Sequence, residues 1–186
     1  MNSTVPITVT DLELVDCTNN KPATFAAVYD FYFSRVYMYI RYRVGDPSVA
    51  DDLTSKAFEQ ALKKLDTYSP KRAPFAAWMF TIARNAVNDH LRAMRRHPSL
   101  PFDALFERRN NDDPPEEMVV QQEEKNRLLR AVARLKERDR ELIALKFATG
   151  LTNRQIAEIL SLTEKNVSVI LYRAIRDLRV HLKAME

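Results

Sequence analysis

The segment LTNRQIAEILSLTEKNVSVILYRAIRDL, residues 151–178, predicts two short helices joined by a tight turn. Thr152 and Gln155 have the spacing of a capping box, in which the two residues satisfy each other's free backbone N–H groups at a helix start. Ser161 and Glu164 have the same spacing and predict a second capping box before the next helix. Two short helices joined by a three-residue turn form the pattern of a helix-turn-helix.

The second helix of this pair has an apolar face and a polar face. Its apolar residues recur every three or four positions and predict a stripe that packs against a core. A helix fits the major groove of DNA, and its N-terminal residues reach the base edges. The polar face and one residue of the preceding helix supply the candidate contacts with bases and phosphates, which are Arg154, Lys165, Asn166, Ser168, Tyr172, Arg173 and Arg176.

A plain helical hairpin with a charged, solvated face would show the same pattern. The upstream segment Leu128–Gly150 favours the DNA-binding interpretation, because it supplies the support helices that such a motif needs and places Gly150 at a helix C-cap. The centre of the second helix, Ser168-Val169-Ile170, carries no charge, so the module neutralises few phosphates and would bind DNA weakly alone. We therefore expect another attachment to hold it on DNA.

The N-terminal half of the chain also has a helical pattern. Its periodicity, from Thr24 onward, is interrupted by turn signals at Gly45-Asp46-Pro47 and at residues 68–74. No stretch shows the strict apolar–polar alternation of a strand. We expect helices that start near Thr24, Ser48 and Pro74 and cover about residues 23–43, 48–65 and 74–95.

A proline-containing, acidic segment separates the two helical halves. Residues 98–124 contain four prolines, which no long helix can cross, and residues 98–125 carry 8 acidic and 3 basic side chains. The flanking residues 66–97 and 126–186 have basic excesses, which attract phosphate backbones. The chain is therefore predicted to be all-α, with a tail (1–22), a small helical domain (23–97), a linker (98–124) and a second helical domain (125–186).

Several classes of site are absent from the sequence. The single cysteine, Cys17, excludes an internal disulfide, and the three histidines lack metal-ligand spacing. Only two glycines are present, so the glycine-rich phosphate loops are missing. No apolar run is long enough to span a bilayer. We therefore expect no metal, no cofactor and no membrane insertion, and a cytoplasmic location.

An enzyme is one alternative to a DNA-binding protein. It would need a convergent set of acids, histidine or cysteine, and the acidic residues Asp46, Asp51 and Asp52 are the nearest candidates. Adjacent residues on a helix point about 100° apart, so Asp51 and Asp52 cannot easily face one metal. The sequence therefore favours a binding protein over an enzyme.

The segment PFAAWMFTIARNAVNDHLRAMRRH, residues 74–97, combines an apolar helix face with asparagines and arginines on the other face. An aromatic loop with basic residues precedes it. Basic residues beside an aromatic ring suit a single DNA strand, because the backbone charge is neutralised and a base can stack or be captured. The candidate contacts are Lys64, Tyr68, Lys71, Arg72, Asn85, Asn88, Arg92, Arg95 and Arg96.

Three stretches together resemble the sigma factors of bacterial RNA polymerase, of the small extracytoplasmic-function type in the sigma-70 superfamily. They are Asp46–Thr54 followed by Phe58, the segment from Phe75 to Arg92, and the helix-turn-helix, and the resemblance covers about residues 24–97 and 125–183. It implies that domain 23–97 is sigma region 2 and that domain 125–186 is region 4. The implied function is promoter-specific transcription initiation.

The resemblance also implies partners. Region 2 would dock on the clamp helices of the polymerase's largest subunit through Asp46, Asp51, Asp52, Leu53 and Phe58. It would open the minus-10 element with the loop around Tyr68, while region 4 would sit on the polymerase flap and read the minus-35 element. The linker would thread toward the active-site and RNA-exit channels. An anti-sigma factor would hold the protein inactive.

Two stretches depart from the family pattern. Ser55-Lys56 stands where relatives usually carry Gln-Glu, and residues 165–170 replace the common Gly-Thr-Val-Lys-Ser-Arg of the recognition helix. An unusual minus-35 preference is therefore expected. The remaining alternative is an autonomous helix-turn-helix regulator with a helical sensor domain, which would need a ligand pocket or dimer seam in residues 24–97.

Overall fold

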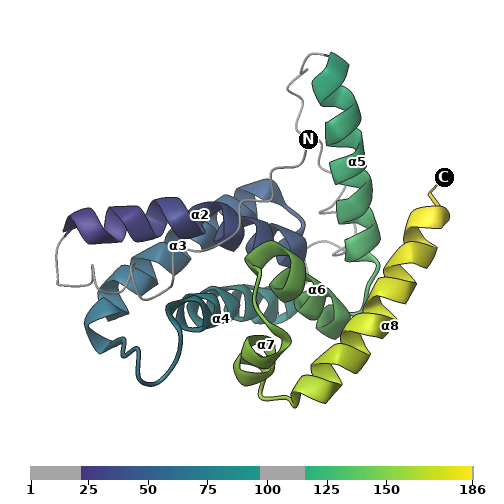
Figure 1. Cartoon of the computed structure of the whole chain (residues 1–186). Helices are drawn as coiled ribbons and strands as arrows, with labels where there is room; N and C mark the ends of the chain where they lie inside the picture. The colour runs from purple at the N-terminus through teal and green to yellow at the C-terminus, as the bar shows by residue number, and fades with distance from the viewer. Residues whose placement is uncertain (1–21, 97–115, 186) are drawn as a thin grey trace.

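The computed structural model describes residues 22–96 and 116–185, and these residues are α-helical with no strand among them (Figure 1). The N-terminal half consists of α2 (Pro22–Val44), α3 (Pro47–Lys64), the short 3-10 helix η1 (Leu65–Thr67) and α4 (Phe75–Arg96). The C-terminal half consists of α5 (Glu116–Ala133), α6 (Glu137–Thr149), α7 (Asn153–Leu160) and α8 (Glu164–Lys183). The prediction of an all-α chain is confirmed.

Aromatic side chains form the core of the N-terminal half. Tyr32 and Tyr39 of α2 are buried against Phe80 of α4, with ring centroids 6.3 Å and 6.0 Å apart in edge-to-face geometry. Such pairs contribute beyond their buried area because the positive ring edge meets the negative face. The three predicted N-terminal helices therefore exist close to their predicted bounds and pack as one bundle.

The start of α3 differs from the prediction. Asp46, not Ser48, is the N-cap, and its carboxylate accepts the Val49 N–H at 3.0 Å. Pro47 occupies the first turn, where a missing N–H costs nothing. Asp46 is 5% exposed, so this carboxylate is part of the folded interior rather than of the open surface.

The helix-turn-helix geometry comes from its capping residues. Thr152 and Gln155 form the predicted capping box, and Gly150 takes the left-handed conformation, φ 74°, at the end of α6. The predicted second capping box is wrong, because Ser161 is the left-handed C-cap of α7, with φ 53°. Thr163 caps α8 instead, accepting the Asn166 N–H at 3.2 Å. The turn thus reverses the chain within three residues.

The two halves pack against each other and share one continuous hydrophobic core. Helix α6 lies between α2 and α8, and α7 rests against α4 (Figure 1). Buried residues of both halves, such as Val36 and Leu145, belong to the same cluster. The predicted division into two helical parts is therefore compatible with the structure, but the parts are in close contact in this arrangement.

The end of the predicted linker is helical. Helix α5 begins at Glu116, directly after Pro114-Pro115, so residues 116–124 are helix and not linker. The rest of the predicted linker and the predicted tail lie outside the described residues, apart from Pro22, which is the first residue of α2. Within the described parts, no helix is both long and apolar enough to cross a membrane.

The Asp46 cap leads to a stability prediction. Asp46→Ala should lower the free energy of unfolding by about 1 kcal/mol, because the acceptor for the Val49 N–H is lost. Asp46→Asn keeps a capping oxygen and should retain most of that free energy. Urea denaturation measures both, with the exposed Ser48→Ala as control; an equal loss for Ser48→Ala would contradict the cap assignment.

Candidate nucleic-acid interface

The predicted recognition face of α8 is at the surface. Lys165, Asn166, Arg173 and Arg176 are exposed, and the Tyr172 side chain is 73% exposed. The apolar stripe of the same helix faces inward, with Val167 among its buried members. Because one helix face is fixed in the core, the opposite face is presented as a rigid surface that a DNA groove could accept.

Ser168 is exposed and makes two hydrogen bonds within the protein, and its DNA contact stays a prediction. Its hydroxyl accepts a hydrogen bond from Asn153 Nδ2 at 3.1 Å and donates one to the Glu164 carbonyl at 3.0 Å. The bond from Asn153 joins the start of α7 to α8, whereas the bond to Glu164 lies within α8. Arg154, the candidate on α7, is exposed and lies 3.5 Å from Glu158 one turn along its own helix.

Tyr68 holds the loop between η1 and α4. Its ring packs 5.2 Å from the Phe75 centroid and 5.1 Å from the Trp78 centroid, and its hydroxyl donates to the Ala73 carbonyl at 3.2 Å. The ring is half-buried, with Trp78 also partly exposed beside it. Three exposed cations lie near Tyr68 in the sequence, namely Lys64, Lys71 and Arg72. The arrangement combines a stacking surface with charges for a backbone, as single-strand binding requires.

The polar face of α4 divides into two parts. Asn85 and Arg96 are exposed to solvent. Asn88 instead accepts a hydrogen bond from Arg43 of α2 at 3.0 Å, and Arg95 pairs with Glu137 of α6. Of the predicted DNA contacts on α4, only Arg95 therefore forms an ion pair with the other half of the molecule among the described residues, while the exposed Arg92 pairs with Asp89 of its own helix.

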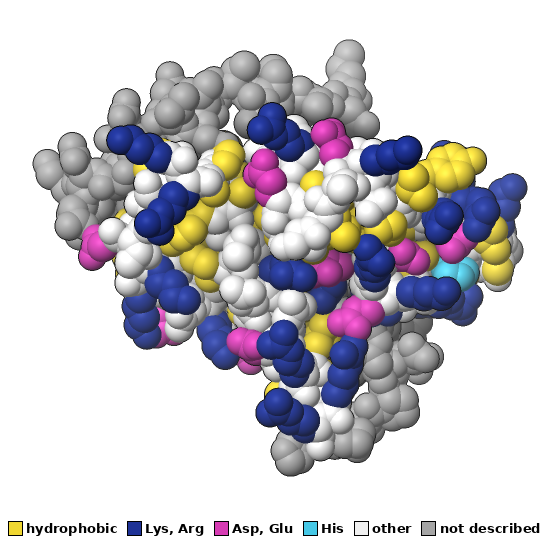
Figure 2. Space-filling model, turned by 90° about the horizontal axis from the view of Figure 1, so that it is seen from below, with side chains coloured by type: hydrophobic (Ala, Val, Ile, Leu, Met, Phe, Trp, Pro, Cys, Tyr) yellow, Lys and Arg dark blue, Asp and Glu magenta, His cyan; other side chains and the backbone are white. Residues whose placement is uncertain are grey.

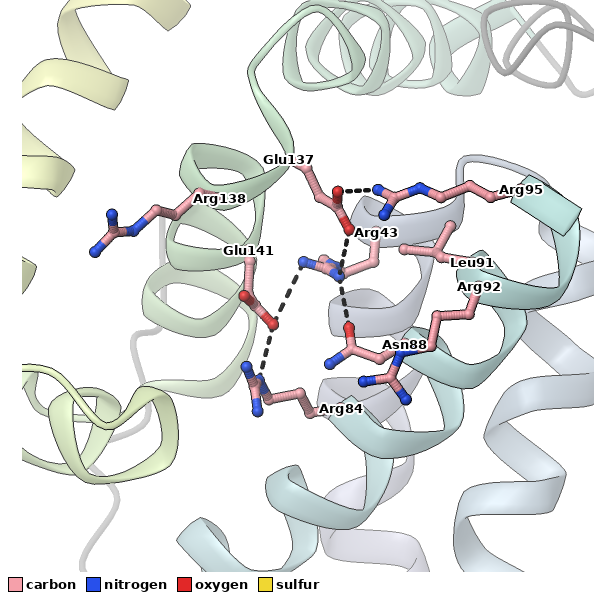
Figure 3. A pocket seen from close by; sticks show the side chains of 9 residues that line it. All are labelled: Arg43, Arg84, Asn88, Leu91, Arg92, Arg95, Glu137, Arg138 and Glu141. Carbon is pink, nitrogen blue, oxygen red and sulfur yellow. Dashed lines mark hydrogen bonds and ion pairs between the residues drawn. The ribbon is translucent and has the colours of Figure 1, made fainter.

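A pocket of about 300 Å³ lies where α2, α4 and α6 meet (Figure 3). Arg43 is 1% exposed at its base, with Nη1 3.4 Å from Glu141 Oε1 and Nη2 3.8 Å from Glu137 Oε1. Arg84 Nε donates to the same Glu141 oxygen at 2.9 Å. Five arginines and two glutamates line the pocket, so its walls carry an excess of positive charge.

Tyr39 cannot supply a counter-charge to this pocket. Burial raises the pKa of its phenol far above the ordinary value, and the nearby Arg43 only partly opposes this effect. The phenol therefore stays neutral, and Glu137 and Glu141 are the acids that balance Arg43, Arg84 and Arg95.

Comparison with known proteins identifies both halves. Residues 28–97 match the family model for sigma-70 region 2, and residues 125–178 match the model for sigma-70 region 4. The chain is 31% identical over 160 residues to the ECF RNA polymerase sigma factor RpoE of Cereibacter sphaeroides, which covers 86% of this chain and 87% of that protein. The chain belongs to the extracytoplasmic-function group of the sigma-70 family.

One further relative and one solved structure are similar to this chain. The sigma factor is 34% identical over 168 residues to BldN of Streptomyces coelicolor, covering 90% of this chain and 64% of that protein. This chain thus spans about two thirds of the length of BldN. The fold resembles the solved sigma factor RpoE of Bartonella quintana in complex with the anti-sigma factor NepR, with a TM-score of 0.68, 21% identity and coverage of 86% and 96%.

The predicted polymerase-binding residues of the sigma factor fall into two groups. Asp51 and Asp52 are exposed on the first turns of α3. Leu53 and Phe58 are 6% and 3% exposed and belong to the core, and the Phe58 ring lies 4.7 Å from that of Tyr29. A direct polymerase contact stays a prediction for the two exposed aspartates, whereas burial gives Leu53 and Phe58, like the cap Asp46, a structural role in this arrangement.

A half-buried cation, Arg41, lies close to Asp51. Burial lowers the pKa of Arg41, and its neighbours Tyr37, Asp46 and Asp51 oppose that effect. The pKa of the Tyr37 phenol is raised, mainly by burial and then by Asp51. The N-terminal end of α3 in the sigma factor is therefore an electrostatically coupled surface in which Asp51 takes part.

Six residues of the pocket were not among the predicted site residues, namely Arg43, Arg84, Leu91, Glu137, Arg138 and Glu141. A signal for the first exists: Val36, Tyr39 and Ile40 are buried, and Arg43 follows them at helical spacing on the same face of α2. An arginine on a buried face requires acidic partners. Which acids supply them depends on how the halves pack, and no local pattern encodes that. Among the described residues, no cluster of histidine, cysteine, aspartate or glutamate could hold a metal ion.

The aromatic loop leads to a spectroscopic prediction. Trp78 is the only tryptophan of the chain, so its fluorescence reports on the contact with Tyr68. Tyr68→Ala should shift the emission to longer wavelength and increase quenching by acrylamide, because the indole becomes more exposed. Tyr68→Phe keeps the ring and should leave the emission close to that of the wild type. Identical spectra for Tyr68→Ala and the wild type would contradict the packing.

Proposed function

We propose that this chain binds core RNA polymerase and directs transcription initiation at promoters by recognising minus-10 and minus-35 elements, without chemistry of its own. The observation that supports this role is the presence of both sigma-70 regions in one chain, each with a surface suited to DNA. Region 4 presents the exposed polar face of α8, and region 2 presents the aromatic loop around Tyr68. Because RNA polymerase works in the cytoplasm, so does a protein with this role.

The polymerase supplies the attachment that the recognition helix lacks. The predicted contacts of region 4 carry four cations, Arg154, Lys165, Arg173 and Arg176, and affinity for DNA grows with the number of phosphates neutralised. Tethering two weakly binding modules raises the effective concentration of each at its site. We infer that Asp51 and Asp52 contact the clamp helices and that region 4 rests on the flap, so that each half binds DNA from a fixed position.

Control by an anti-sigma factor is part of the proposal. The Bartonella quintana RpoE with the same fold was solved in complex with the anti-sigma factor NepR. Such an inhibitor would cover the polymerase-binding and DNA-binding faces. Copurification of a cognate inhibitor with the tagged chain tests this point, and its release should restore polymerase binding.

Polymerase docking can be tested with one charge reversal. Asp52→Arg should weaken binding to bacterial core RNA polymerase by about tenfold or more, or on the order of 1.4 kcal/mol, because a charge pair is replaced by repulsion. Asp66→Arg, an exposed reversal on η1, is the matched control and should bind like the wild type. Size-exclusion chromatography and fluorescence anisotropy measure the complex. If the wild-type chain does not bind core polymerase but binds duplex DNA alone, the proposal is contradicted and the chain is an autonomous regulator.

The recognition helix leads to a second prediction on the assembled holoenzyme. Asn166→Ala should relax base preference within the minus-35 element, because an exposed amide near the start of α8 can read base edges. Arg173→Ala should weaken binding to all sequences alike and reduce the salt slope by about one, as loss of one phosphate contact does. Binding to a randomised minus-35 library at several salt concentrations separates the two effects. Loss of sequence preference in Arg173→Ala but not in Asn166→Ala would contradict these roles.

A further inference from the structure

The pocket between α2, α4 and α6 places two glutamates of region 4 against arginines of region 2. Glu137 pairs with Arg95, and Glu141 accepts from Arg84 and lies 3.4 Å from Arg43 (Figure 3). Arg92 and Asn88 line the same pocket. Three of these region 2 residues, Asn88, Arg92 and Arg95, are candidate contacts with the minus-10 element. The glutamates thus reach part of the surface proposed for DNA.

A carboxylate and a phosphate are interchangeable partners for arginine. Both present two or more oxygens to the planar fork of the guanidinium group, and both form charge-assisted hydrogen bonds with it. Glu137 and Glu141 lie one turn apart on α6 and point toward α4 together (Figure 3). A DNA phosphate cannot approach Arg84 or Arg95 along the same direction while these carboxylates are in place.

The distance between the two promoter elements requires the two halves of the sigma factor to separate when it binds a promoter. Elements centred at minus-10 and minus-35 are roughly 85 Å apart along B-form DNA at about 3.4 Å per base pair. A compact chain of this length has a radius of gyration of only roughly 16 Å. With α6 packed on α2 and α7 on α4, the closed arrangement cannot contact both elements. Promoter binding therefore needs the contacts of the pocket to break.

We propose that Glu137 and Glu141 form an intramolecular clasp that occupies the region 2 cations as a substitute for promoter phosphates, so that the closed sigma factor and the promoter-bound sigma factor exclude each other. This inference rests on the proposed function. The clasp joins the halves through charge, and DNA phosphates take over Arg84 and Arg95 once the halves separate. Figure 2 shows the face of the molecule below α4 and α7, where many Lys and Arg side chains lie among fewer Asp and Glu.

The buried Arg43 makes the clasp cooperative. Its guanidinium is 1% exposed and shares Glu141 with Arg84, so both region 2 cations depend on one carboxylate of region 4. A buried charge that loses its partner is strongly unfavourable. Arg43 therefore favours full closure or full separation, in which water reaches the guanidinium, over a partly open state.

The test uses the full chain and a double variant. E137Q/E141Q removes both carboxylates, and E123Q/E124Q is the matched control, because it changes the net charge equally at two exposed positions of α5. The probe is a single-stranded DNA oligonucleotide of about 25 bases, with binding followed by anisotropy at several salt concentrations. E137Q/E141Q should bind about tenfold more tightly than the control, as expected if the open form rises from roughly a tenth of the population to most of it. The slope of log affinity against log salt should become steeper by about one to two.

Small-angle X-ray scattering separates a clasp from simple repulsion. The double variant should have a larger radius of gyration than the wild type and the control. Tighter DNA binding without this expansion would mean that the glutamates only repel DNA, and it would overturn the clasp. Equal affinities for the double variant and the control would overturn it as well.

A milder variant covers the case in which E137Q/E141Q does not fold, as circular dichroism would reveal. E137Q alone keeps Glu141 beside Arg43, and it alters a side chain that is 46% exposed. It should bind the oligonucleotide about threefold more tightly than E123Q, and equal affinity would overturn the proposal. Binding to core polymerase is measured in parallel. Failure of the proposed function abolishes that binding in the wild type, whereas failure of the clasp leaves it intact.

Discussion

A guanidinium group that is almost wholly buried must have counter-charges, and at Arg43 this requirement joins the two halves of the sigma factor. The residue ends α2 within region 2, but its acidic partners lie on α6 of region 4. Asn88 of α4 accepts a hydrogen bond from Arg43 Nη2 at 3.0 Å, whereas the contacts with the two glutamates are ion pairs. Side chains of three helices, α2, α4 and α6, therefore meet at one charge.

Packing in the core also determines which helix faces are available for binding. Apolar stripes fix α3, α4 and α8 in the core, so their opposite faces are held in defined directions. On α8 that face is open to solvent, and around Tyr68 an aromatic cluster is combined with cations. On α4 the outer face is shared between solvent and the clasp. A surface proposed for DNA is thus partly satisfied within the molecule, which reduces its availability before the polymerase binds.

Local sequence patterns predicted much of this structure. The helices follow from apolar periodicity, and the Thr152–Gln155 box and Gly150 follow from capping chemistry, because these interactions lie within a few residues of each other. Two helix caps were predicted incorrectly. Thr163, not Ser161, caps α8, and Asp46, not Ser48, caps α3. In each case two candidate residues lie close together, and the position at which the core fixes the helix determines which of them becomes the cap.

Packing between distant segments could not be predicted in this way. The sequence predicts a polymerase contact for Phe58 and a DNA contact for Asn88, but contacts with other helices determine where these side chains lie. The pairing of Arg43 with Glu137 and Glu141 joins residues more than ninety positions apart and has no sequence signature. Such ion pairs form because the apolar surfaces of the two halves pack together and bring charged residues at the edge of the contact close to each other.

The most direct test of the whole account is reconstituted transcription. Core RNA polymerase, the purified chain and fragments of bacterial genomic DNA are incubated with nucleotides, and the 5′ ends of the transcripts are sequenced. The account predicts starts that depend on the chain and share sequence motifs about 10 and 35 base pairs upstream. Start sites that are the same with and without the chain, while it stays folded and bound to polymerase, would contradict it.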